Sequence, residues 1–87
     1  MERIVNVAYY EKKDYDRFLS IIDDRDNVHD SWEEWFLTFM KMNEYLKSQG
    51  LFVKVVTVDL DELIKYCADR KIKNNGAARS QFVVEER

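Results

Sequence analysis

Only two glycines and no proline interrupt this 87-residue chain. Because these residue types form most turns, their scarcity limits the fold to regular elements joined by few, short loops. Both glycines, Gly50 and Gly76, come after segments with a helical pattern of apolar residues. Functional groups are therefore expected on helices and strands or at their ends.

The N-terminal half predicts one strand and two helices. Residues 4–9 alternate and are β-branched, which is typical of a strand. From Glu11 the period changes to that of an amphipathic helix of about four turns, which ends in a loop over residues 25–29. Ser31 and Glu34 form a capping box that predicts the start of a second helix, and Gly50 fits the residue after its last turn.

The C-terminal half predicts a second strand at residues 51–58 and a third helix that begins after the capping pattern of Asp59 and Glu62. Residues 77–87 fit either a strand or a short helix capped by Asn75, and we favour the helix. The chain is thus interpreted as one α+β domain, residues 1–87, rich in helix. About four helices and a small two-stranded sheet are expected in the order β-α-α-β-α-α. The two helices between the strands are long enough for a parallel crossover.

Composition narrows the class of protein. The single cysteine, Cys67, cannot form an intramolecular disulfide, so a reducing compartment is expected. The N-terminus lacks the pattern of a signal peptide, and no apolar run approaches the roughly 20 residues of a membrane span. The net charge of −3 disfavours nucleic-acid binding. We therefore expect a cytoplasmic protein with no membrane partner and no cofactor.

Several short motifs are spread over most of the chain: Asp24-Arg25, His29, Trp32 with Trp35, Tyr66-Cys67, and the segment from Gly76 through Arg79 to Phe82. This pattern resembles a set of small bacterial proteins of unassigned function. The resemblance implies a bacterial cytoplasmic origin, and it carries no activity or site residue with it.

The acidic loop around His29 is one candidate site. Four carboxylates and the only histidine lie within residues 23–30, so this loop could bind a cation or hold an acid–base pair. Its spacing does not match an EF-hand, and zinc would need more His or Cys ligands. A solvated loop is the interpretation we favour. Cys67 could act as a nucleophile with His29, but its apolar neighbours favour a packing role.

A basic stretch supplies a second candidate. It comprises Arg70, Lys71, Lys73 and Arg79, around the predicted break at residues 74–76. These cations and the start of the following helix could bind a weak anion or nucleic acid. We favour the simpler interpretation, that they complement helix dipoles.

The third candidate is the second helix, whose large apolar residues span roughly 160°, wider than a core-facing stripe. Part of this stripe, around Trp32, Trp35 and Phe36, is predicted to contact a protein partner or a second copy of the chain. The leading hypothesis is a small non-enzymatic interaction module that binds a protein partner or itself as a homodimer. The alternatives are a small enzyme or metal-binding protein using the His29 loop, or an anion binder through residues 70–79.

Overall fold

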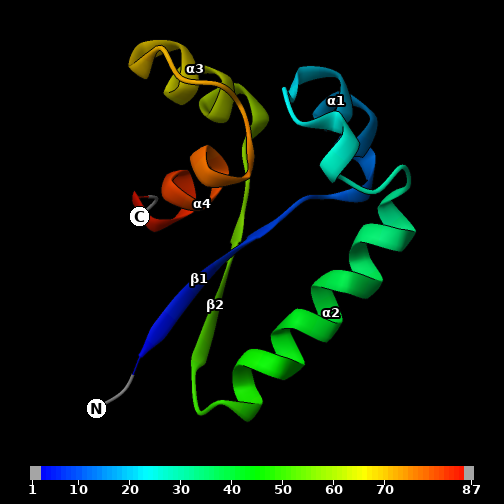
Figure 1. Ribbon diagram of the computed structural model, residues 1–87, viewed down its shortest axis with the longest axis vertical. Coiled ribbons are helices and arrows are strands. Elements are labelled where there is room, and N and C mark those ends of the chain that lie inside the picture. Colours follow the sequence, from blue (N-terminus) through cyan, green and yellow to red (C-terminus); the bar gives the residue numbers. More distant parts are fainter. Residues whose placement is uncertain (1–2, 86–87) are drawn as a thin grey trace.

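The computed structural model describes residues 3–85 and has the predicted α+β architecture. The helices and strands follow one another in the expected order, β-α-α-β-α-α (Figure 1). They are β1 (Ile4–Tyr9), η1 (Lys12–Asp14), α1 (Tyr15–Ile21), η2 (Arg25–Asn27), α2 (Trp32–Ser48), β2 (Phe52–Thr57), α3 (Leu60–Arg70) and α4 (Gly76–Glu85), of which η1 and η2 are short 3-10 helices.

The two strands pair in parallel. Ile4 lies opposite Phe52, and Tyr9 lies opposite Thr57. A parallel pair needs a long crossover connection, which α1 and α2 supply. The parallel crossover that the sequence allowed is thus the connection observed in the structure.

Helices cover both faces of this small sheet. On one face, Tyr9 of β1 contacts α2, with its ring 5.4 Å from that of Phe39. On the other face, Val56 of β2 joins the main core with residues of α1, α3 and α4. Its most buried side chains are Phe18, Leu63 and Val83, with at most 2% of their surface exposed.

Three of the helices begin at the caps predicted from sequence. The side chains of Ser31, Asp59 and Asn75 accept hydrogen bonds from backbone N–H groups three residues later, at 3.2, 3.1 and 3.0 Å. These bonds satisfy donors that a helix leaves without an internal partner. The helical prediction for the C-terminal segment is confirmed up to Glu85, and residues 86–87 lie outside the described part of the chain.

The first helix is shorter than the four turns predicted. Its α-helical part is only seven residues long, because residues 12–14 form the 3-10 helix η1 at its start and Ile22 is already extended at its end. The end is set by tertiary contacts: Asp23 N–H donates to the Asn74 carbonyl at 2.8 Å, and the Asp23 carboxylate accepts from Asn74 N–H at 2.7 Å. These bonds to a distant segment replace those that would have continued the helix.

Candidate functional site

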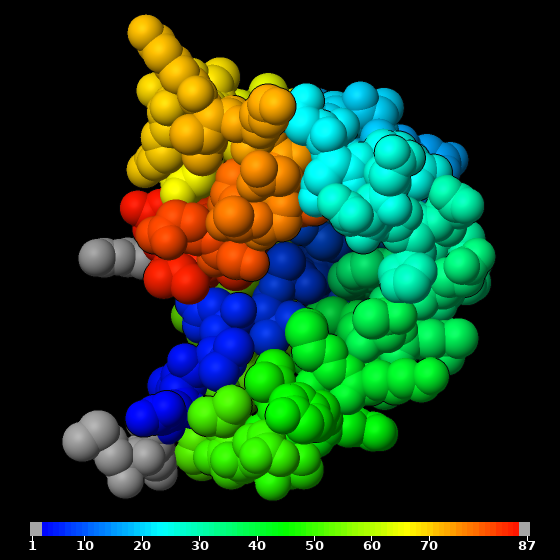
Figure 2. Space-filling model, in the orientation of Figure 1, coloured from blue at the N-terminus to red at the C-terminus, as the bar shows by residue number. Residues whose placement is uncertain are grey.

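A cleft of about 520 Å³ runs along β1 between α2 and α4. Figure 2 shows the hollow, with β1 in blue at its floor, α2 in green on one side and α4 in orange and red on the other. Four consecutive residues of β1, from Val5 to Ala8, line it. Because side chains of a strand alternate between its faces, four neighbours can line one cleft only along the edge of the strand. The floor is therefore the edge of β1 opposite β2.

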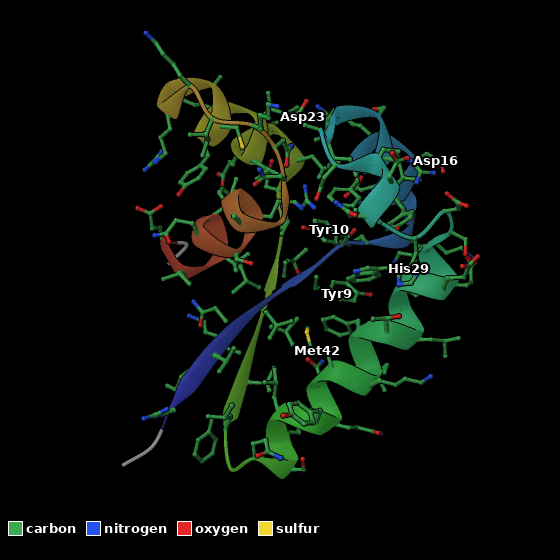
Figure 3. The ribbon with its side chains drawn as sticks, viewed as in Figure 1. Tyr9, Tyr10, Asp16, Asp23, His29 and Met42 are labelled. Carbon is green, nitrogen blue, oxygen red and sulfur yellow. The ribbon has the colours of Figure 1, made fainter. Side chains whose placement is uncertain are left out.

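The two walls differ in character. The α2 wall is mainly apolar and includes Trp35, Phe39, Met42 and Leu46, whereas the α4 wall combines the apolar Val83 with Ser80 and Arg79. Figure 3 shows Tyr9 directed from β1 toward α2, and Met42 facing the same space. Among the described residues that line the cleft there is no Asp or Glu. The cleft thus offers apolar surface, neutral polar groups and one cation, Arg79, which is paired with Asp24.

Asn6 ties the floor of the cleft to its α4 wall. Its side-chain amide donates to the Val83 carbonyl at 2.8 Å, across 77 positions of sequence. That carbonyl lies in the last turns of α4, where helical partners run out. The bond fixes the spacing between β1 and α4, and therefore the position of one wall.

The three aromatic residues predicted as a partner surface are all half-buried, and the structure divides them. Trp35 lines the cleft, with its ring 5.4 Å from that of Tyr10. Trp32 donates its indole N–H to the Tyr10 carbonyl at 2.8 Å and stacks on Phe36 at 4.7 Å. Phe36 is followed one turn later by Met40, which is exposed. Trp35 thus belongs to the cleft, whereas Trp32 and Phe36 lie on a separate flank of α2.

Tyr10 lines the cleft and is almost completely buried. Its ring stacks on Phe18 with centroids 4.0 Å apart, and only 5% of the residue is exposed. Burial raises the pKa of Tyr10 to about 12, because the phenolate would lose its hydration. The group therefore stays a neutral phenol at physiological pH.

His29 also lines the cleft and is exposed. Its Nε2 lies 3.0 Å from the Thr38 hydroxyl, and its backbone carbonyl accepts from the Tyr15 hydroxyl at 2.7 Å. Its neighbours in the acidic loop are paired in another way, since Arg25 forms an ion pair with Asp30 at 2.8 Å. The histidine thus faces a hydroxyl and not a carboxylate.

The sequence allows a metal or acid–base site in the acidic loop, but the side chains of residues 3–85 form no metal-binding cluster there. Across that range, no group of three or more His, Cys, Asp and Glu side chains is placed to hold a metal ion. Cys67 lies in the core on α3, and no hydrogen bond joins it to His29 within the same range. Burial raises the pKa of the Cys67 thiol, which opposes the thiolate form that a nucleophile requires.

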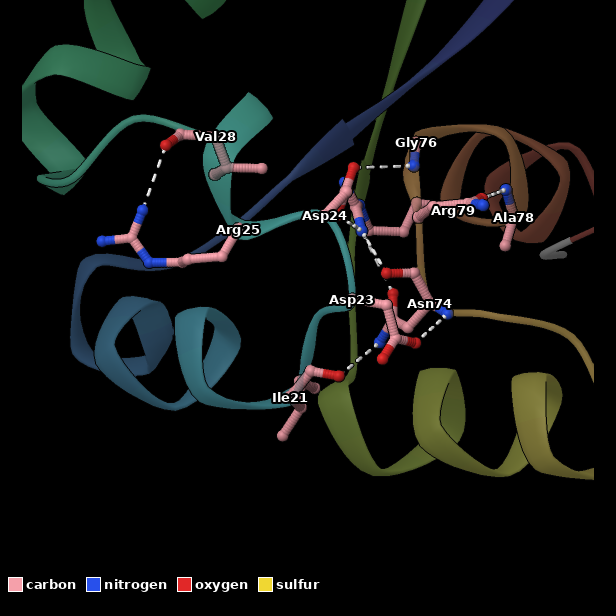
Figure 4. Close-up of polar contacts among 10 residues, drawn as sticks. Ile21, Asp23, Asp24, Arg25, Val28, Asn74, Gly76, Ala78 and Arg79 are labelled. Atoms are coloured by element: carbon pink, nitrogen blue, oxygen red, sulfur yellow. Dashed lines mark hydrogen bonds and ion pairs between the residues drawn. The ribbon is translucent and has the colours of Figure 1, made fainter.

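Asp24 and Arg79 form a buried ion pair beside the cleft (Figure 4). Two guanidinium nitrogens of Arg79 donate to the two carboxylate oxygens of Asp24, at 2.9 and 2.8 Å. Gly76 N–H donates to the same carboxylate at 3.1 Å, and Arg79 also donates to the Asn74 carbonyl at 2.9 Å. The hydrogen bonds from Arg79 hold the pKa of Asp24 below its usual range. The network ties the loop after α1 to the start of α4.

The predicted anion contacts are separated by this network. Arg79 is 8% exposed and already paired with Asp24, so it does not join the other three cations on the surface. Arg70 lies over the ring of Tyr66 at 3.8 Å and pairs with Glu85 at 3.6 Å. Lys71 and Lys73 are exposed. Burial and pairing of Arg79 thus divide the basic stretch that the sequence suggested.

Sequence reasoning did not identify the cleft or the Asp24–Arg79 pair. One signal for the cleft was Asn6, a polar residue within an otherwise apolar strand. Asp24 and Arg79 both belong to the motifs of the resemblance, but nothing in their spacing shows that they meet. Their separation of 55 residues is bridged only by tertiary folding.

Comparison with protein-family models, with curated proteins and with solved structures found no match. None of the helices within residues 3–85 is both long enough and apolar enough to cross a bilayer.

Proposed function

We propose that this protein is a non-enzymatic interaction module that binds part of a protein partner in the cleft along β1. The observation that carries the proposal is a strand edge at the floor of a mainly apolar cleft between two helices, one of which is tied to that strand by the bond from Asn6 to Val83. Pockets that bind ligands are commonly concave, mainly apolar and of about 300–1,000 Å³, which includes this one.

The titratable groups around the cleft support binding more than catalysis. Tyr10 is held neutral by burial, and Arg79 is neutralised by Asp24. His29 faces the hydroxyl of Thr38, so it lacks the carboxylate that commonly orients a catalytic histidine. A general acid–base mechanism needs a second positioned group, and the lining residues supply none.

Selection of peptides from a random display library on the immobilised protein tests this function. A selected peptide is then titrated by calorimetry against the parent protein, Ser80→Trp and Ser20→Trp. Both serines are exposed on helices, but only Ser80 lines the cleft. We expect Ser80→Trp to weaken binding at least about tenfold and Ser20→Trp to leave it unchanged. Equal binding by the parent protein and Ser80→Trp would remove the cleft as the binding site.

Self-association is a second candidate, and the flank of α2 formed by Trp32, Phe36 and Met40 favours it. The stacked rings of Trp32 and Phe36 are half-buried, and Met40 beside them is 45% exposed. Twofold pairing would let one surface cover its own copy. Sedimentation velocity at micromolar concentration tests this, with Met40→Lys as the disrupting variant and Lys41→Met as a control. A monomer at every concentration would reject this candidate.

We also propose that the protein works in the bacterial cytoplasm. Support comes from the single cysteine, which is buried and has no intramolecular partner for a disulfide, and from the resemblance of the sequence pattern to small bacterial proteins. Fractionation of the native host with an antibody against the chain tests this localisation.

A further inference from the structure

We infer that the partner segment binds as a third strand, which pairs with the free edge of β1 and consists of a short run of uncharged, apolar residues. This inference rests on the proposed function, since it names the kind of segment that the cleft takes.

The first step is which peptide groups of β1 are free. The carbonyls of Arg3 and Tyr9 accept hydrogen bonds from Phe52 and Val58 of the β2 segment, both at 2.9 Å. In a parallel pair, alternate residues of a strand direct their peptide groups toward the same neighbour. The peptide N–H and C=O groups of the odd-numbered residues of β1 therefore point to β2. The peptide groups of Asn6 and Ala8 point to the opposite edge.

That edge has no partner within residues 3–85. No hydrogen bond of the described residues reaches the backbone N–H or C=O of Asn6 or Ala8 from another segment or side chain. Both residues are half-buried at the floor of the cleft. Buried peptide groups normally form hydrogen bonds. An added strand would supply the missing partners, because the extended backbone of β1 already directs these groups as a sheet requires.

The second step is the character of the added strand. It would lie between α2 and α4, so its side chains would meet Phe39 and Met42 on one face and Val83 and Ser80 on the other. Strands buried on both faces are nearly continuous runs of apolar residues. With no carboxylate in the lining and Arg79 already paired, a charged side chain would lose its hydration without a partner.

The third step is the length and source of the strand. β1 has six residues, so a segment of about four to six residues would match it at roughly 3.3 Å per residue. A second copy pairing through its own β1 is disfavoured by shape. The edge of that copy would also lie between its α2 and α4, and the helices of the two copies would meet first.

Hydrogen exchange of backbone amides, followed by NMR, tests the inference. The probe is a synthetic peptide from the library selection, added at saturation to the parent protein. We expect the amides of Asn6 and Ala8 to exchange at least about tenfold more slowly when the peptide is bound. The amide of Val7 points to β2 and serves as the internal control, with little change. Peptides that bind should also contain the uncharged apolar run.

The outcomes separate this inference from the proposed function. If Ser80→Trp abolishes binding but the amides of Asn6 and Ala8 exchange as before, the cleft binds a partner and strand addition is wrong. A second readout uses peptides methylated at alternate backbone nitrogens. Methylation at one alternate set should weaken binding at least about tenfold, and methylation at the other should be tolerated. Equal tolerance of both sets would also overturn strand addition, while failure of every peptide to bind in the cleft would overturn both proposals.

Discussion

Replacing Asp24 with Asn removes the negative charge from the ion pair with Arg79 and keeps nearly the same shape. The side chains of Arg79 and Asp24 are only 9% and 14% exposed, so the guanidinium would be left largely buried without its counter-charge. Breaking such a pair by removing one partner costs about 3–5 kcal/mol. Because Asp24 keeps some contact with water, we expect a loss near the lower limit, about 3 kcal/mol.

Urea denaturation of the parent protein and Asp24→Asn measures this loss. For a domain of this size, about 3 kcal/mol corresponds to roughly 12–24 °C in Tm. The matched control is Asp30→Asn, whose ion pair with Arg25 is exposed and should change stability by at most about 1 kcal/mol. Adding Arg79→Met to Asp24→Asn should cost less than the sum of the single changes, since the two groups act as one unit.

The same pair predicts a dependence on pH. The pKa of Asp24 is lowered in the folded protein by hydrogen bonds from Arg79. Its stabilising contribution is therefore complete above the unfolded-state pKa of about 3.9, and it is lost as pH falls through the folded-state pKa. The difference between the parent protein and Asp24→Asn should thus shrink in acid. A loss from Asp24→Asn no larger than that from Asp30→Asn at pH 7 would refute the assignment of the pair as a structural link.

Three further predictions concern single residues. Ser31→Ala should cost about 1 kcal/mol in urea denaturation, because the first turn of α2 loses its cap, whereas Ser48→Ala at the other end should cost much less; equal losses would contradict the capping role. Cys67 should react with a thiol reagent at pH 8 far more slowly in the native protein than in urea, because burial both hinders access and raises its pKa, and equal rates would show an exposed thiol. Millimolar calcium, magnesium or zinc should leave Tm unchanged; a rise of several degrees that disappears in His29→Ala would reveal a metal site in the loop.

Local features explain how much of the fold could be predicted. The caps Ser31, Asp59 and Asn75 bond to N–H groups only three residues away, so the start of each helix depends on neighbours in the sequence. Gly50 adopts a φ of +79° after α2, the backbone conformation for which glycine was expected there. The order of strands and helices followed from these local signals and from the change in apolar period.

Contacts between distant residues decided the rest. The sequence pattern suggested that Arg79 acts together with the neighbouring cations. Folding instead buries it against Asp24, 55 residues earlier. The end of α1 likewise depends on the bonds between Asp23 and Asn74. The cleft arises only where the edge of β1, α2 and α4 come together. The sequence by itself determined the types and order of the elements and the starts of α2, α3 and α4, because propensity and capping act within one or two helical turns. Only the tertiary structure decided which polar groups are paired and which strand edge stays free, because these depend on how elements far apart in the chain pack together.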